Sequence, residues 1–404
     1  MSLIENLNDE NKWDEFLKTK EESNNIPSKV VKEYRDFIDN KKYKAITTSI
    51  LNGEYEFSLP NKVLIGKMGK SKKRVVYIYK EDENYVLKML SFLLYHYDEM
   101  FSPNLYSFRK NSGVKKAINK IRSLPSEYRK FAYKVDLSNY FNSIPTDILL
   151  KELKEDLKDE KLYNLINSLI SNPKVMYNGN VILEEKGIMA GVPISSFLAN
   201  YYLKDLDWYF YNQNILYARY ADDIIVFGKT KREIEEYRKN IIEFIQKRGL
   251  TVNAEKEKFY NESEKIEFLG FSLENNVIDI NQNSFKKIKG KIRRTARGLR
   301  RWMIKKNASG EVTLKAMNRK FNRKFFGKNE NDLTWKSWFF PVINTDETLK
   351  KIDNYMQDEQ RYLITGVHNK KNFEKVPYEF LKSCNYKSLV NEYYKSKSEK
   401  NKID

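Results

Sequence analysis

The sequence has very little cysteine and histidine. Among its 404 residues there is one cysteine, Cys384, and there are two widely separated histidines, His96 and His368. A single cysteine excludes a disulfide framework, and so few Cys and His residues argue against a zinc site, a Cys/His endonuclease module and a Ser-His-Asp triad. No apolar run reaches the roughly 18 residues of a membrane span, and the polar start MSLIENLNDENKW is unlike a signal peptide. These absences predict a cytoplasmic protein without membrane association, whose chemistry depends on carboxylates, lysines and bound metal.

Positive charge is concentrated in one segment. The formal net charge is +19, and residues 286–328 hold 17 Lys and Arg against one acid, Glu311. Such a block favours a polyanionic partner, and nucleic acid fits better than a membrane because no lipidation motif or amphipathic anchor accompanies it. An AT-rich genome accounts for abundant Lys, Asn, Tyr and Ile, but not for a segment with almost no Asp or Glu. A solvated basic face without a partner is the alternative interpretation.

Residue patterns divide the chain into three predicted regions. Residues 1–60 read as a helical extension, residues 61–278 alternate strands with helices, and residues 279–404 are mainly helical and basic. Within the middle region, residues 194–212 are predicted to form one buried helix. The mixture of short apolar strands and helices there predicts an α+β fold with an antiparallel sheet.

The basic segment also carries an apolar stripe. Hydrophobic residues recur at spacings of three and four, while Lys and Arg fill the remaining positions, so an amphipathic helix is predicted. The stripe consists of Phe285, Ile288, Ile292, Ala296, Leu299 and Met303.

Three aspartates are the candidate catalytic groups. Asp222 and Asp223 lie between two apolar half-strands, Leu216–Tyr220 and Ile224–Phe227, and Asp136 ends another apolar run. Adjacent acids repel each other, so a hairpin that presents two of them needs a cation or solvent for compensation. Magnesium prefers carboxylate and phosphate oxygens, which makes it the expected ion. A solvated Asp-Asp turn is the competing interpretation of the pair taken alone.

The segment LYARYADDIIVF (216–227) resembles the Tyr-x-Asp-Asp motif of reverse transcriptases. Six further segments resemble motifs of that family and occur in the family's order, which is far more specific than one short motif. They are VLIGKMGKSKKR (63–74), FSPNLYSFRKNSGVKKAI (101–118), FAYKVDLSNYFNSI (131–144), GIMAGVPISSFLANYYL (187–203), RGLTVNAEKEK (248–258) and FLGF (268–271). The resemblance implies a right-hand polymerase, with fingers and an antiparallel palm over residues 61–278 and a helical thumb over residues 279–404.

The resemblance also implies the catalytic centre. Asp136, Leu137, Asp222 and Asp223 would hold two Mg²⁺ ions, and Lys256 would lie near the triphosphate as a further catalytic residue. Two such ions clamp the attacking and leaving oxygens of an in-line phosphoryl transfer. Whether Lys256 protonates the leaving pyrophosphate or only neutralises it stays open.

Substrate contacts follow from the same resemblance. Lys67 and Arg74 match the basic positions that hold the triphosphate. Phe141 matches the position of a bulky side chain, the steric gate, whose ring would collide with a ribose 2′-hydroxyl. Gly191 matches the glycine that lets the backbone approach the nucleotide. The residues expected to bind template and primer are Arg109, Tyr220, Phe268, Gly270, Arg293, Arg294, Arg297 and Arg301.

Some features narrow the subfamily. Ala190 stands where many relatives have Gln, which puts strict template fidelity in doubt, and the Asn-Ala-x-x-His and Val-Thr-Gly signatures of retron enzymes are absent. The palm resembles that of group II intron maturases, and residues 363–394 resemble the tail of abortive-infection and other defence-associated reverse transcriptases. The resemblance implies a structured non-coding RNA template, deoxynucleotides and a DNA product as partners. Some members assemble into oligomers, so a homo-oligomer is also considered.

The expected function is therefore RNA-directed DNA polymerisation in defence against phage. Two other functions remain open. One is a domesticated group II intron-type enzyme acting in splicing or spacer acquisition, and the other is a catalytically idle RNA-binding scaffold.

Overall fold

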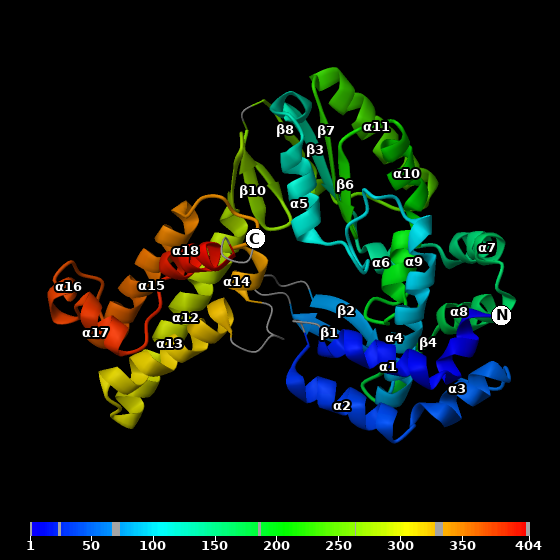
Figure 1. Ribbon diagram of the computed structural model, residues 1–404, viewed down its shortest axis with the longest axis horizontal. Helices are drawn as coiled ribbons and strands as arrows, with labels where there is room; N and C mark the ends of the chain where they lie inside the picture. Colours follow the sequence, from blue (N-terminus) through cyan, green and yellow to red (C-terminus); the bar gives the residue numbers. More distant parts are fainter. Residues whose placement is uncertain are drawn as a thin grey trace. The chain divides into compact units, whose positions relative to one another are not determined.

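The computed structural model describes residues 2–22, 26–66, 73–184, 187–262, 264–327 and 334–400. The chain divides into two compact units, residues 1–262 and 263–404 (Figure 1).

The predicted boundary between residues 278 and 279 lies inside the second unit. Its strands are tied to helices that follow them, because the backbone N–H of Asn344 donates to the Ile278 carbonyl at 3.1 Å. The Thr348 hydroxyl likewise donates to Asp279 at 2.7 Å.

The first unit begins with helices that share its core. Trp13 is fully buried and stacks on Tyr43, with ring centroids 4.4 Å apart. The Leu3 N–H and the Ser2 hydroxyl both donate to the carboxylate of Asp159, which lies far along the chain. Residues 1–60 are therefore part of this unit. Its helices up to the first palm strand are η1 (Leu3–Asn8), α1 (Glu10–Glu21), α2 (Ser28–Asp39), α3 (Tyr43–Leu51), α4 (Glu81–Leu93), η2 (Leu94–Met100), α5 (Val114–Ser123) and η3 (Ser126–Arg129).

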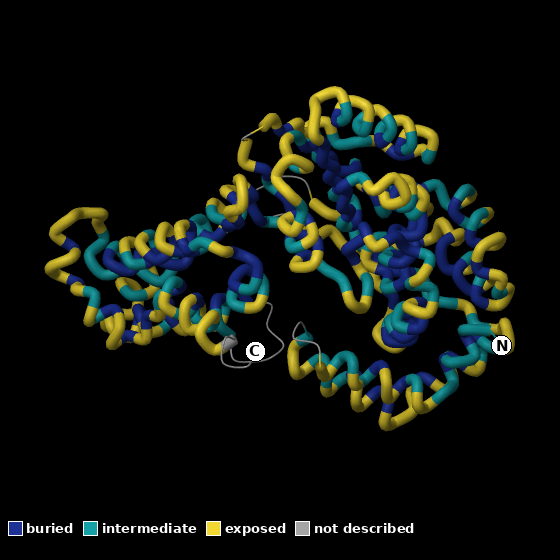
Figure 2. The backbone as a smooth tube through the Cα atoms, turned by 45° about the horizontal axis from the view of Figure 1, so that its top comes forward, coloured by how far each residue is buried: buried dark blue, intermediate teal, exposed yellow. Residues whose placement is uncertain are grey.

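An antiparallel sheet forms the centre of this unit. Its strand order is β6-β7-β3-β8, and these strands are β3 (Phe131–Asp136), β6 (Tyr217–Tyr220), β7 (Asp223–Gly228) and β8 (Lys258–Tyr260). The apolar runs of β3 and β7 are almost wholly buried, and helix α11 packs against both strands. Figure 2 shows this buried backbone, with exposed residues gathered on the outer helices. The predicted α+β architecture with an antiparallel palm sheet is confirmed.

A second sheet has the order β2-β1-β4-β5. Its strands are β1 (Asn61–Gly66), β2 (Lys73–Ile78), β4 (Lys174–Tyr177) and β5 (Asn180–Leu183). The turn between β4 and β5 has positive φ at both Asn178 and Gly179 (50° and 83°), which is the conformation of the tight hairpin turns that Asn-Gly favours.

Residues 194–212, predicted as one buried helix, form two. The helices are α9 (Ser195–Tyr202) and α10 (Lys204–Asn212), separated at Leu203, whose φ and ψ are −114° and 14°. Neither proline nor glycine marks this break, so the sequence carries no signal for it. The remaining helices of the unit are α6 (Tyr140–Ser143), α7 (Thr146–Leu157), α8 (Glu160–Ser171), α11 (Lys231–Lys247) and η4 (Ala254–Lys256).

The second unit combines a small sheet with helices. The sheet, of order β11-β10-β9, consists of β9 (Ile266–Phe268), β10 (Phe271–Glu274) and β11 (Val277–Ile280). The helices are α12 (Gln282–Lys306), α13 (Gly310–Phe326), α14 (Trp335–Trp338), α15 (Glu347–Thr365), α16 (Asn372–Lys375), α17 (Tyr378–Ser383) and α18 (Leu389–Lys400).

The predicted amphipathic helix is confirmed as α12. Ile288, Ile292 and Ala296 are buried, and α12 packs along α15. Near the far end of the unit, the buried Cys384 offers its carbonyl to the Asn318 amide at 2.9 Å. Among the described residues, no helix combines the length and the apolar character needed to cross a membrane.

Candidate active site

The three predicted aspartates meet at one end of the palm sheet. Asp136 ends β3 and lies directly across from Asp223, which begins β7 in the antiparallel register. Asp222 occupies the turn before β7, and its carbonyl accepts the Leu137 N–H at 3.2 Å. The sequence folds this way because apolar strands on either side bury their side chains and leave the polar residues at the turn.

The turn that carries Asp222 contains a residue in the left-handed region. Ala221 has a φ of +57°, a conformation that costs energy for a residue with a side chain. Its N–H donates to the Ser107 hydroxyl oxygen at 2.8 Å, and that hydroxyl donates to the side-chain oxygen of Asn200 at 3.0 Å. The Asn200 amide returns a hydrogen bond to the Ser107 carbonyl at 2.9 Å. These fully buried partners hold the turn in its strained form.

A buried ion pair lies beneath the same turn. Arg219 and Asp207 are both fully buried, and the guanidinium donates to the carboxylate at 2.8 and 2.5 Å. The Arg219 guanidinium also donates to the carbonyls of Ala221 and Asn200, and the Tyr217 hydroxyl completes the set by donating to Asp207. The pair is therefore fully hydrogen-bonded, which is the condition for a buried pair to be tolerated.

None of Arg219, Asp207, Ser107 and Asn200 was singled out from the sequence. One signal was present: Arg219 is a charged residue within the apolar half-strand 216–220, where only a buried partner can compensate it.

Lysines pair with two of the predicted aspartates. The Lys256 ammonium lies 2.6 Å from Asp136 Oδ2, and the Lys134 ammonium lies 3.3 Å from Asp223 Oδ1. Lys256 reaches this position because the chain after α11 returns to β3, where the Asn253 N–H donates to the Asp136 carbonyl at 2.7 Å.

Burial changes the acidity of the aspartates. It raises the pKa of Asp223 to about 6, and the nearby charge of Asp136 adds to the rise while Lys134 opposes it. Burial and then the charge of Asp136 also raise the pKa of Asp222, against which Lys256 and Arg74 act. Ionised carboxylates here lack sufficient compensation, which is the environment that a bound cation relieves.

Carboxylate oxygens are the type of donor that a hard divalent cation prefers. Asp223 Oδ1 is buried without a hydrogen-bond partner of good geometry, although Lys134 stands nearby. Within the described parts of the chain, no three carboxylates are close enough to form a single three-ligand cluster. The two lysine ammonium groups instead take up the charge of Asp136 and Asp223. Leu137 is buried and its N–H donates to the Asp222 carbonyl, so its own carbonyl oxygen is the atom with which it could ligate a metal.

The predicted nucleotide contacts occupy two neighbouring elements. Arg74 is exposed on β2, and its charge is felt at Asp222. Lys67 lies outside the described residues. Gly191 has a φ of +103°, and a Cβ there would lie 3.0 Å from the Tyr77 carbonyl oxygen. The close approach that this glycine permits is therefore to strand β2, to which Ala190 is joined by a 2.8 Å hydrogen bond from the Tyr77 N–H.

Phe141, the predicted gate, lies in the short helix α6 after Asp136. Its carbonyl accepts the Ile188 N–H at 2.9 Å, and its ring meets Phe108 edge-on at 6.4 Å. A Cβ on Gly187 would lie only 2.4 Å from the Phe141 carbonyl oxygen. Gly187 therefore permits the close approach of its segment to the backbone of Phe141.

The predicted template and primer residues have different surroundings. Arg109 is engaged within the protein: its guanidinium makes two 2.8 Å bonds to Asp98 and one of 2.7 Å to the Ser102 carbonyl. Tyr220 ends β6, next to the catalytic turn, and burial raises its pKa.

The other template and primer residues belong to the second unit. Phe268 is buried in β9, and Gly270 follows it with a φ of +91°. The predicted arginines are all exposed on α12, namely Arg293, Arg294, Arg297 and Arg301.

Several known proteins are similar to part of this chain. The putative COX1/OXI3 intron 2 protein of Saccharomyces cerevisiae is 32% identical over 117 residues, which is 29% of this chain and 14% of that protein. The putative COX1/OXI3 intron 1 protein is 24% identical over 233 residues, 44% of this chain and 28% of that protein. The retron Ec86 reverse transcriptase of Escherichia coli is 22% identical over 196 residues, covering 47% and 56% of the two chains. The chain thus spans less than two thirds of the length of these relatives.

Some solved structures of telomerase are also similar to this chain. Telomerase from Candida albicans, in complex with a fragment of telomeric RNA, has a TM-score of 0.45 and 15% identity, covering 89% of this chain and 70% of that one. Apo telomerase from Candida tropicalis has the same TM-score and identity, with 86% and 72% covered.

The family model described as reverse transcriptase (RNA-dependent DNA polymerase) matches residues 65–273, slightly more than half of the 404-residue chain. The matched range includes the catalytic turn, Asp136, Phe141 and Lys256. The chain belongs to the reverse transcriptase family.

Proposed function

We propose that this chain is an RNA-directed DNA polymerase that extends DNA from deoxynucleoside triphosphates. The observation that carries the proposal is the placement of Asp136 across from Asp223, with Asp222 in the adjoining turn and Lys256 ion-paired with Asp136. Family membership supports the same reaction.

Two Mg²⁺ ions are proposed at the three aspartates. Bound there, they would supply the positive charge that offsets the carboxylates and orients the phosphate oxygens. The lysines that now pair with Asp136 and Asp223 would be released toward the triphosphate. Lys256 is exposed enough for this change, since 47% of its side chain is accessible.

Other residues of the first unit are proposed to position the nucleotide or to support the site. Arg74 on β2 supplies a planar guanidinium that suits phosphate oxygens. Phe141 places a ring beside the sugar, where it excludes a 2′-hydroxyl. The buried pair of Arg219 and Asp207 keeps the turn at Asp222 in place without contacting substrate.

The test is incorporation of deoxynucleotides on an RNA template by the purified protein with Mg²⁺. Replacing Asp222 by Ala should abolish incorporation, whereas Asp205→Ala, at an exposed carboxylate on α10, should not change it. Incorporation by Asp222→Ala at the wild-type rate would overturn the mechanism.

We further propose that the DNA product serves antiviral defence, on a structured non-coding RNA template. The resemblance of residues 363–394 to defence-associated reverse transcriptases supports this role. Cells carrying the gene should resist phage in a plaque assay, and Asp222→Ala should remove the resistance. Full resistance with the Asp222→Ala protein would count against a role for the product.

An intron-related role is the second candidate, because two relatives are named as intron proteins. Sequencing the RNA that co-purifies with the protein separates the two roles. Recovery of a flanking intron RNA would support the second candidate, and recovery of a dedicated non-coding RNA the first.

A further inference from the structure

A groove of about 1110 Å³ lies within the second unit, between α12, α13 and the loop after α17. Its lining includes Trp302 from α12, Arg319 and Phe326 from α13, and Lys387 from the loop. Its volume exceeds the roughly 300–1,000 Å³ of pockets that enclose a single small molecule. The groove therefore suits a segment of a longer chain.

The charged residues that the structure describes in the groove are all basic. Among the described residues, four cations line it, Lys315, Arg319, Arg323 and Lys387, and no carboxylate does. Lys315 is paired with Glu311 at 2.5 Å. Within the described ranges, neither Arg319 nor Lys387 has an acid at ion-pairing distance. The positive charge of Arg319 and Lys387 therefore attracts a polyanion.

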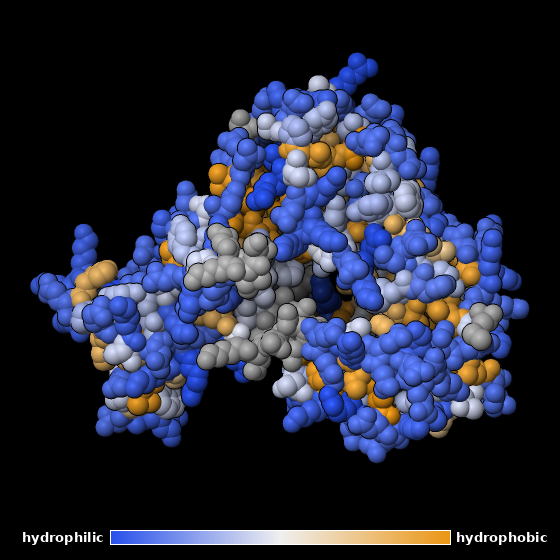
Figure 3. All heavy atoms as spheres, viewed as in Figure 1, coloured by the Kyte–Doolittle hydropathy of each residue, from blue (hydrophilic) through white to orange (hydrophobic). Residues whose placement is uncertain are grey.

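An exposed aromatic ring completes the groove. All five tryptophans lie in the described ranges, and Trp302 alone among them is exposed, with 42% of its surface accessible. Val312, on the facing helix, is 54% exposed and also lines the groove. Figure 3 shows hydrophobic side chains over the end where α12 turns into α13, within a mostly hydrophilic surface. An exposed indole next to cations is the combination that stacks a nucleobase and holds its phosphates.

We infer that this groove binds single-stranded nucleic acid, with one base stacked on Trp302 and the backbone phosphates on Arg319 and Lys387. A strand is favoured over a duplex because stacking on a ring requires an unpaired base. The exposed arginines of α12, such as Arg297 and Arg301, do not line the groove. The site is thus additional to the template and primer surface, and it does not depend on the proposed polymerase activity.

The first test uses the fluorescence of Trp302. An RNA oligonucleotide of about 10 nucleotides, within the site size of single-strand binders, is titrated into the full-length protein without Mg²⁺ or deoxynucleotides. A DNA strand and an RNA duplex of the same sequence are titrated in parallel. The single strands should quench the emission, and the Trp302→Phe protein should lack this quenching while still binding. Equal quenching by the duplex would overturn base stacking.

The second test measures affinity by fluorescence anisotropy of a labelled strand. Trp302→Ala should weaken binding by between about 5-fold and 150-fold, which corresponds to the 1–3 kcal/mol of one base–aromatic stack. Phe373→Ala, at an exposed ring elsewhere in the same unit, should bind as the wild type does. Unchanged affinity of a folded Trp302→Ala protein, verified by its melting curve, would overturn the assignment.

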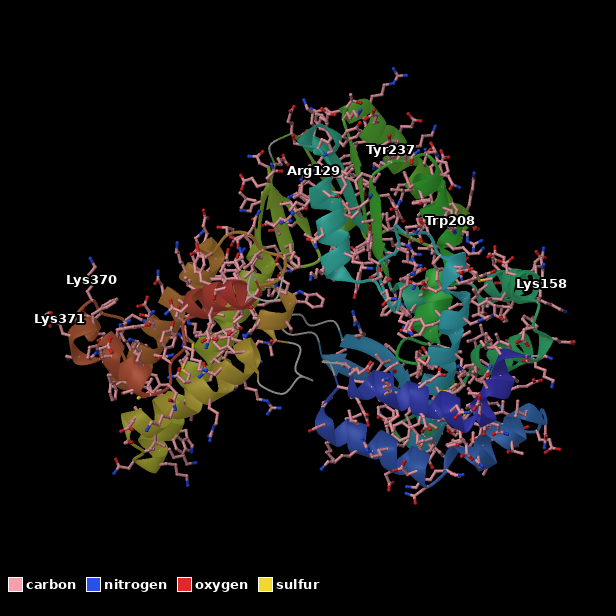
Figure 4. The ribbon with its side chains drawn as sticks, in the orientation of Figure 1. Arg129, Lys158, Trp208, Tyr237, Lys370 and Lys371 are labelled. Atoms are coloured by element: carbon pink, nitrogen blue, oxygen red, sulfur yellow. The ribbon has the colours of Figure 1, made fainter. Side chains whose placement is uncertain are left out.

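A matched pair of double variants tests the cations. Arg319→Ala with Lys387→Ala should reduce the slope of log affinity against log salt by about 1.4, since each phosphate contact to a single strand contributes about 0.7. Lys370→Ala with Lys371→Ala removes the same charge from the exposed turn before α16, which is outside the groove (Figure 4), and should leave the slope unchanged. Competition by polyglutamate as strong as that by RNA would show that the groove takes acidic polypeptide instead.

Discussion

At the scale of single residues, the aspartates of the catalytic end are held at an energetic cost. Burial raises the pKa of Asp223 to about 6, above its ordinary value of 3.8. Its ionised form therefore destabilises the fold at pH values above about 6, and this cost declines as pH falls from there toward 3.8. A cation bound at Asp223 would offset this cost.

The first prediction concerns this cost. In EDTA at pH 7.5, Asp223→Asn should stabilise the protein by up to about 3 kcal/mol, the equivalent of about two pKa units. The gain should shrink as pH approaches 5, and Mg²⁺ should raise the melting temperature of the wild type alone. Differential scanning fluorimetry across pH, with and without Mg²⁺, measures these effects. A variant less stable than the wild type in EDTA would contradict the account.

The second prediction concerns sugar selection. Phe141→Ala should raise the use of ribonucleotides, because the ring next to the 2′ position is lost. Gly187→Ala should have a similar but smaller effect, since its Cβ would displace the Phe141 carbonyl. Single-nucleotide incorporation with paired ribo- and deoxynucleotides measures the ratio. Gly53→Ala, at a glycine with open space around it, controls for loss of a glycine alone, although its φ of +75° carries some strain.

At the scale of elements, the catalytic turn depends on partners from three other segments. Ser107, Asn200 and Asp207 come from a loop and from helices α9 and α10, yet all meet beneath Ala221 and Arg219. Their hydrogen bonds fix the backbone on which Asp222 is mounted.

The third prediction separates positioning from stability. Ser107→Ala removes the acceptor for the Ala221 N–H and should lower kcat about 10-fold while KM for the nucleotide changes little. Asp207→Asn should instead destabilise the fold by about 3–5 kcal/mol, because Arg219 is left buried without its counter-charge. Steady-state kinetics and urea unfolding distinguish the two effects. Ser123→Ala, at an exposed serine of α5, is the control.

The palm elements could be predicted from the sequence because each depends on local pattern. Apolar half-strands flank Asp222 and Asp223, and an apolar run precedes Asp136. The strands, and the position of the aspartates at the strand ends, can therefore be predicted from the neighbouring residues alone. The pairing of Arg219 with Asp207 could not be predicted, since it joins two charged residues of different elements. A palm that extends to residue 278 stays a prediction, because the division at residue 262 separates compact units and does not define polymerase subdomains. Strands β9 to β11 have the composition of palm strands, and only their contacts with later helices assign them to the second unit.

At the scale of the whole molecule, the exposed arginines of α12 and the three aspartates belong to different units. The carboxylates proposed for catalysis belong to the first unit, and the exposed arginines of α12 belong to the second. If the α12 arginines bind nucleic acid as proposed, substitutions there should change affinity without altering the aspartates of the first unit.

The fourth prediction follows from that division. Arg297→Ala with Arg301→Ala should weaken binding of an RNA–DNA primer–template and reduce the salt slope by about 1.8, at about 0.9 per duplex phosphate contact. The turnover of the bound complex should change much less than its affinity. Binding by anisotropy across salt concentrations, with single-turnover extension at saturating protein, measures both. A loss confined to turnover would contradict a backbone-binding role.

The lone cysteine has a practical consequence for observing this protein at work. Cys384 is buried, and burial raises the pKa of its thiol, so little reactive thiolate is exposed. The natural chain should therefore react little with thiol-directed dyes and spin labels. One cysteine introduced at Ser123 and another at Lys370 would place a reporter on each unit. Energy transfer between the two labels would then record any rearrangement of the units as template, primer and nucleotide are added in turn.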